Sequence, residues 1–79
     1  MKLTQLKLGH KGIITGIEDS CNLKGRLEEL GFVIKSEVIP LHKSLGGNIT
    51  AYYIKGAVMA IRNEDASFID VIEKVEDYE

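Results

Sequence analysis

The chain has 79 residues, of which 44% are hydrophobic and 28% are charged, and its formal net charge is −2 at pH 7. This length allows one small domain with a minimal core, and the composition is that of an ordinary soluble globule rather than of a disordered chain. No apolar run approaches the ~18 residues of a membrane span, no secretory signal begins the chain, and the acidic balance disfavours nucleic acid as a partner.

Short segments rich in Ile and Val, punctuated by glycines, predict an all-β fold, a small barrel with tight turns. A first strand is expected at residues 12–17, where Gly16 indicates a bulge or a close backbone approach. One short helix is expected at residues 22–31, with Asn22 as its N-terminal cap and Gly31 as its left-handed C-terminal cap, followed by Phe32 as the hydrophobic contact. A strand follows at residues 37–42, and Pro40 within it indicates an edge or a bulged position.

The clearest unit is a hairpin of residues 48–54 and 57–62, joined by the two-residue loop Lys55-Gly56. In that register the bulkier face is assigned to the core and consists of Tyr52, Ile54, Met59 and Ile61. The outer face then holds Ala51, Tyr53, Val58 and Ala60. Residues 63–67 are expected to form one capped helical turn, and a strand at 69–73 closes the sheet with Ile69 and Val71 pointing inward.

Candidate metal ligands are few. His10, Cys21 and His42 do not have the spacing of a structural zinc site, so no metal or cofactor site is expected. Cys21 precedes the helix and could become more thiolate-like there, although a half-buried small residue is the favoured interpretation. Cys21 is the only cysteine, so no intrachain disulfide can form, which is typical of a protein in a reduced, cytosolic setting.

No arrangement of catalytic side chains stands out. Serine, histidine and acid do not occur in a recognisable order, and Gly46-Gly47-Asn48 lacks the following helix and lysine of a phosphate-binding loop. The chain is therefore expected not to be an enzyme, and the glycine-rich stretch is expected to be a turn.

A docking surface is the favoured functional feature, since contiguous exposed apolar area marks interfaces. The expected partner-binding residues lie on the helix with its flanks and on the outer side of the hairpin; they are Leu23, Lys24, Arg26, Leu30, Tyr53 and Val58. Alternatively, a loop or the C-terminal residues cover the outer hairpin face. Arg26 and Arg62 are the only arginines, and either could act as an arginine finger in trans, although pairing with a neighbouring carboxylate is favoured.

Several motifs resemble the FeoA family of small bacterial ferrous iron transport proteins. They are Leu6-x-x-Gly9-x-x-Gly12, Arg26-Leu27-Glu28-Glu29-Leu30-Gly31-Phe32, Glu37-Val38, Leu45-Gly46-Gly47-Asn48, Gly56, Ala60-Ile61-Arg62-x-x-x-Ala66 and Ile69-x-Val71. The resemblance implies a Src-homology-3-like barrel with an inserted helix over residues 1–75, followed by an acidic tail at 76–79. It also implies a cytoplasmic, non-enzymatic accessory of the membrane ferrous iron transporter FeoB, whose cytosolic portion contains a G domain.

The chain departs from the family pattern at two turns. Ile34-Lys35 stands where the family usually has Pro-Gly, and Ile49 stands where a proline commonly follows the glycine-rich turn. Two other functions are considered. A nucleic-acid-binding barrel would need a basic, aromatic-bearing face. A stand-alone regulatory barrel similar to the C-terminal domain of iron-dependent repressors would normally follow a DNA-binding helical region, whereas this chain looks complete without one.

Overall fold

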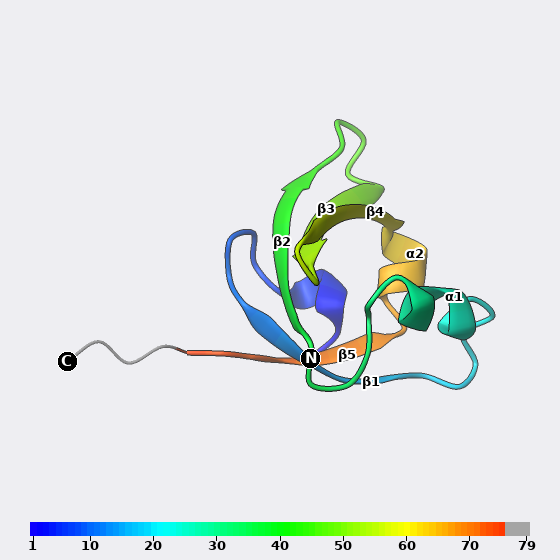
Figure 1. Cartoon of the computed structure of the whole chain (residues 1–79). Helices are drawn as coiled ribbons and strands as arrows, with labels where there is room; N and C mark the ends of the chain where they lie inside the picture. The colour runs from blue at the N-terminus through cyan, green and yellow to red at the C-terminus, as the bar shows by residue number, and fades with distance from the viewer. Residues whose placement is uncertain (76–79) are drawn as a thin grey trace.

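The structure is a computed structural model that describes residues 1–75, and it confirms the all-β fold (Figure 1). The expected acidic tail at 76–79 lies outside the described residues. The strands are β1 (Gly12–Ile17), β2 (Glu37–Lys43), β3 (Ile49–Ile54), β4 (Ala57–Arg62) and β5 (Ile69–Glu73). The helical segments are the 3₁₀ turn η1 (Leu3–Gln5), α1 (Lys24–Glu29) and α2 (Asn63–Ala66).

All five strands form one antiparallel sheet in the order β4-β3-β2-β1-β5. The sheet curls so that η1 lies within the curve, and α1 and α2 lie at its open side (Figure 1). The core inside the curve draws on every strand and on α1, and its largest fully buried side chains include Tyr52, Phe32, Leu3, Ile14 and Ile54. Among residues 1–75, no helix is long and apolar enough to cross a membrane.

Two bulges bend the sheet. The register of β1 with β5 shifts between Ile14 and Gly16, which confirms the irregularity expected at Gly16. The register of β2 with β3 shifts between Pro40 and His42. Because β2 lies inside the sheet, the bulged alternative for Pro40 is correct and the edge alternative is wrong.

A proline is tolerated in this interior strand because of the side toward which its nitrogen points. The carbonyl of Pro40 accepts a hydrogen bond from the backbone N–H of Gly9 at 2.7 Å. In a strand the nitrogen and carbonyl of one residue point to the same side. The missing donor of Pro40 therefore faces the Gly9 segment, and the ladder between β2 and β3 loses no hydrogen bond.

The helix α1 ends as expected but begins later than expected. Gly31 has φ +110°, its N–H donates to the Glu28 carbonyl, and the N–H of Phe32 donates to the Leu27 carbonyl, both at 3.0 Å. These two bonds form a Schellman cap. At the other end, the expected cap at Asn22 is wrong, since the N-cap position is Leu23 and no side chain caps it.

The physical reason for the late start is a preceding turn. The N–H of Cys21 donates to the Glu18 carbonyl at 3.1 Å, and the N–H of Lys24 donates to the Cys21 carbonyl at 3.3 Å. These two bonds keep the chain in turns until the helix begins. Asn22 is exposed on this turn. The cap expected for α2 is also not formed, because its N-cap residue is Arg62 and the side chain of Asn63 is bonded elsewhere.

The hairpin of β3 and β4 has the expected register, with Ile54 opposite Ala57, Tyr52 opposite Met59 and Thr50 opposite Ile61. Lys55 and Gly56 have φ +51° and +79°, so the loop is a type I′ turn, whose twist matches that of the strands. Tyr52 is 1% exposed and its ring meets that of Phe32 edge to face, with centroids 6.2 Å apart. In β5, Ile69 and Val71 are buried, as expected.

Candidate docking surfaces

In the part of the chain that the structure describes, the outer face of the hairpin is exposed at Tyr53, Val58 and Ala60, whereas Ala51, also expected there, is buried. Tyr53 is 45% exposed and Val58 is 58% exposed, and they lie opposite each other across β3 and β4. Ile39 of β2 lies opposite Tyr53 on its other side. Three apolar side chains therefore form a row across three strands, which we call the outer apolar row.

A basic hollow lies beside the outer apolar row. It is lined by Tyr53 and Ile39 together with Lys11, Lys35, Ser36, Glu37, Lys55 and Gly56. Three lysines outnumber one carboxylate here, although the whole chain carries a net charge of −2. The pKa of Glu37 is lowered, first by its hydrogen bond with Lys74 and then by the charge of Lys11. This side of the molecule suits an acidic partner surface with an exposed apolar contact.

A second surface lies between α1 and β4, and we call it the α1–β4 groove. Its lining residues are Leu23, Arg26, Leu27, Leu30, Ala60, Ile61, Arg62 and Asp65. Leu27 is 2% exposed and forms the floor, whereas Leu23 is 40% exposed. The structure thus brings together Leu23, Arg26 and Leu30, as expected for a surface on the helix. Sequence reasoning missed that β4 and Asp65 complete the groove, because no local pattern places α1 beside β4.

Lys24 does not line the groove. Its ammonium group contacts Asp19 at 2.7 Å, and this hydrogen bond raises the pKa of Lys24 and lowers the pKa of Asp19. Arg26 forms no ion pair with any residue in 1–75, so the expected pairing with a carboxylate of its helix is wrong. The geometric reason is that α1 is short and Arg26 projects to the exposed rim of the groove, where Asp65 also lies.

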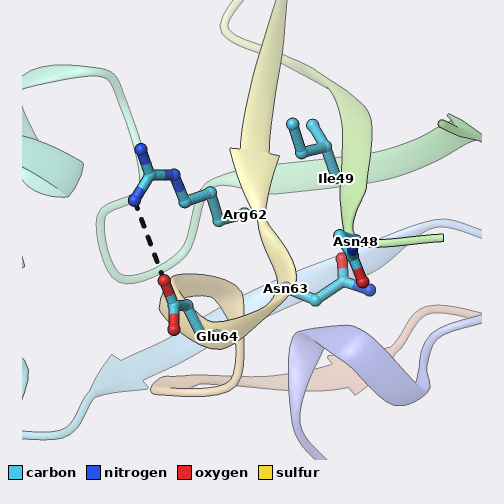
Figure 2. Close-up of a pocket in the computed structure, with 5 residues that line it drawn as sticks. All are labelled: Asn48, Ile49, Arg62, Asn63 and Glu64. Carbon is cyan, nitrogen blue, oxygen red and sulfur yellow. Dashed lines mark ion pairs between the residues drawn. The ribbon is translucent and has the colours of Figure 1, made fainter. Parts of the chain in front are cut away.

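Arg62 stands at the end of β4, beside a third hollow (Figure 2). Its guanidinium lies 3.8 Å from the carboxylate of Glu64, and both side chains are more than 70% exposed. Such a pair contributes little to stability. The carboxylate pairing expected for Arg62 is therefore present but loose.

The same hollow holds a polar clamp made by Asn63. Its amide donates to the Gly47 carbonyl at 2.6 Å, and its carbonyl oxygen accepts from the buried Thr50 hydroxyl at 2.9 Å. The N–H of Asn63 also donates to the Asn48 carbonyl at 2.8 Å. The glycine-rich stretch is thus a turn tied to the start of α2, as the sequence indicated.

The candidate metal ligands lie apart from one another. His10 contacts Glu73 at 2.7 Å, His42 is exposed on β2, and Cys21 is 5% exposed within the core. Within residues 1–75, no three His, Cys, Asp or Glu side chains form a group that could hold a metal ion. Cys21 is more buried than the half-buried residue that the sequence suggested.

These features define a small SH3-like β-barrel with exposed apolar side chains on its surface. The model of the FeoA domain matches residues 1–73, and the chain belongs to the FeoA family. A Campylobacter jejuni protein that carries the name Fe(2+) transport protein A is 30% identical over 71 residues, which cover 90% of this chain and 96% of that protein.

Solved structures agree on the fold. The FeoA of Stenotrophomonas maltophilia, described as a prokaryotic SH3 domain protein and solved with zinc, superposes with a TM-score of 0.79 at 26% identity; the match covers 91% of this chain and 89% of that one. A manganese-dependent transcriptional repressor superposes with a TM-score of 0.85 at 18% identity, over 94% of this chain and 36% of the repressor. The second likeness is one of fold alone.

Proposed function

We propose that this protein is a cytosolic accessory of ferrous iron uptake that contacts the cytosolic part of the membrane transporter FeoB and performs no reaction of its own. Membership of a family linked to ferrous iron transport supports the process. Action by docking is inferred from the outer apolar row, in which Tyr53 and Val58 are exposed beside the basic hollow. Exposed apolar side chains with a charged rim are typical of a docking surface.

The test is binding of the cytosolic part of FeoB, measured by calorimetry with the natural chain and with Tyr53→Glu. The variant buries a charge at the proposed contact, so binding is expected to weaken about a hundredfold or more. Leu45→Glu is the matched control, because Leu45 is fully exposed in the turn between β2 and β3, away from both surfaces. Unchanged binding by Tyr53→Glu would contradict the placement, and no binding by the natural chain would contradict the partner.

The two arginines bear on whether docking also changes GTP hydrolysis by the G domain of FeoB. If either Arg26 or Arg62 were an arginine finger, its replacement by alanine would cost about 10³-fold or more in stimulated hydrolysis. We propose instead that neither is a finger, since both belong to regular elements rather than mobile loops. Hydrolysis rates with each folded alanine variant decide this, and collapse of a large stimulation in one of them would show the opposite.

A second candidate is a regulatory barrel like that of the manganese-dependent repressor, favoured by the shared fold alone. The neighbouring reading frame separates the two candidates. A frame for a membrane GTPase supports the transporter, whereas a frame for a DNA-binding helical region supports the repressor-like role.

A further inference from the structure

The two edge strands of the sheet differ in how they are protected. The edge of β5 is covered by the start of the chain: the N–H of Val71 donates to the Met1 carbonyl at 2.8 Å, the Met1 amine donates to the Val71 carbonyl at 3.1 Å, and Lys2 bridges to Asp70. Among residues 1–75, no strand or bridge pairs with the outer edge of β4. Proteins usually protect such an edge with proline, a bulge or an inward charge. The β4 strand, Ala57–Arg62, has none of the three.

The free hydrogen-bonding groups of β4 follow from the hairpin. Ile54 and Ala57 flank a two-residue turn and so exchange hydrogen bonds, after which bonded and non-bonded pairs alternate. Val58 and Ala60 therefore point their N–H and C=O groups away from β3. In the described part of the chain, no backbone hydrogen bond outside the ladder uses these groups. The edge can accept the backbone of one more extended segment.

The α1–β4 groove runs beside this open edge. Ala60, Ile61 and Arg62 of β4 line one side, and the leucines of α1 line the other. In a strand, alternate side chains point to the same face. A segment added to β4 would therefore present every second side chain to the groove, where Leu23 and Leu30 offer apolar contact.

The charges on the groove favour an acidic group on that segment. Both arginines of the chain, Arg26 and Arg62, lie on the rim, and Arg26 has no ion-pair partner among residues 1–75. Arg62 already lies 3.8 Å from the carboxylate of Glu64, and Asp65 lies on the same surface, so Arg26 is the guanidinium that a carboxylate of the segment would meet. A guanidinium binds a carboxylate in a bidentate geometry, which fixes orientation as well as adding affinity.

We propose that β4 and α1 bind an extended segment of a partner protein as a sixth strand, with apolar side chains toward the leucines of α1 and a carboxylate at Arg26. The open edge determines the extended form of the segment, the groove determines its alternating apolar side chains, and Arg26 determines its acidic residue. This goes beyond the proposed function, because it names the form and chemistry of the bound segment and holds whichever protein supplies it.

The probe is a displayed library of short linear peptides of random sequence, selected on the intact chain, from which the tightest peptide is synthesised. Amide hydrogen exchange at Val58 and Ala60 is expected to slow by about tenfold when the peptide is present at about ten times its Kd. Arg26→Glu is expected to weaken binding by about tenfold or more. Lys7→Glu, the same kind of charge reversal at an exposed position outside the groove, is the control and should bind as the natural chain does.

The proposal is wrong if the selection yields no binder, or if the selected peptide leaves exchange at Val58 and Ala60 unchanged. It is also wrong if Arg26→Glu and Lys7→Glu bind equally well. Sedimentation of the free chain supplies a last check. A dimer with slowed exchange at both amides would show that the edge is used by a second copy of this chain, which would overturn the proposal of a partner peptide.

Discussion

Replacing Leu27 by alanine tests whether α1 is held by the core rather than by its own helical propensity. The Leu27 side chain is 2% exposed and packs in the same cluster as Phe32. The backbone carbonyl of Leu27 also accepts the capping hydrogen bond from the N–H of Phe32. Truncating a buried leucine costs about 2–5 kcal/mol. Because Leu27 also lines the groove, its surroundings can close partly over the gap, and we expect about 3 kcal/mol.

That loss is large for this chain, since domains of this size have unfolding free energies of about 4–12 kcal/mol. At about 4–8 °C per kcal/mol, the melting midpoint should fall by about 12–24 °C. Thermal and urea unfolding, followed by circular dichroism, measure both quantities.

Leu23→Ala is the matched control, because it makes the same chemical change next to the same helix at a side chain that is 40% exposed. We expect it to cost less than about 1 kcal/mol. A cost below about 1 kcal/mol for Leu27→Ala, or equal costs for the two variants, would refute the view that packing of Leu27 holds the helix.

Three further predictions concern the turns and the surface charges. Lys35 has φ +76°, so Lys35→Gly should relieve left-handed strain and raise the unfolding free energy by about 0.5–1 kcal/mol, measured by urea unfolding; a lower midpoint would contradict this. Asn63→Ala removes the partner of the buried Thr50 hydroxyl and should lower the unfolding free energy by about 1–3 kcal/mol in urea unfolding. An unchanged unfolding free energy would show that the hydrogen bonds of Asn63 do not stabilise the fold. The folded-state pKa of Glu37 is lowered, so the ionised side chain stabilises the fold above its unfolded pKa, and this stabilisation is lost as pH falls through the folded-state pKa. The Glu37→Gln variant should therefore lose less unfolding free energy between pH of about 6 and about 3 than the natural chain does.

Local chemistry explains why the hairpin could be predicted in register. Alternation of side chains along 49–62 and a loop ending in Gly56 specify which residues pair, and both signals lie within the segment itself. The end of α1 is equally local, because Gly31 adopts the positive φ that a Schellman cap requires. The class of fold and the burial of Tyr52 follow from the same patterns.

The errors lie where distant segments decide the outcome. The start of α1 is set by the turn through Cys21, whose side chain is anchored in the core, and not by the capping preference of Asn22. Arg26 has no ion-pair partner within residues 1–75 and lies at the rim of a groove that exists only because α1 faces β4, a contact without any sequence signature. Likewise, Pro40 could be assigned to a bulge rather than an edge only after the position of β2 in the sheet was known.

The departure from the family at Ile34-Lys35 has a backbone consequence. The family resemblance implies a glycine where this chain has Lys35, and Lys35 adopts the left-handed conformation with φ +76°. The N–H of Lys35 donates to the Ile14 carbonyl at 2.8 Å, and the N–H of Ile14 donates to the Ser36 carbonyl at 2.9 Å. These bonds to β1 hold the turn in place although its residue type disfavours it.

The pairing of β1 with β5 also orders events during synthesis. Gly12 lies opposite Glu73, and these residues are near opposite ends of the described chain. The ribosome therefore synthesises β1 early and its partner β5 late. The meander of β2, β3 and β4 needs only neighbouring segments and can pair as soon as it emerges. By contrast, β1 keeps one edge unpaired until β5 has left the exit tunnel, and during that interval this edge can pair with another chain.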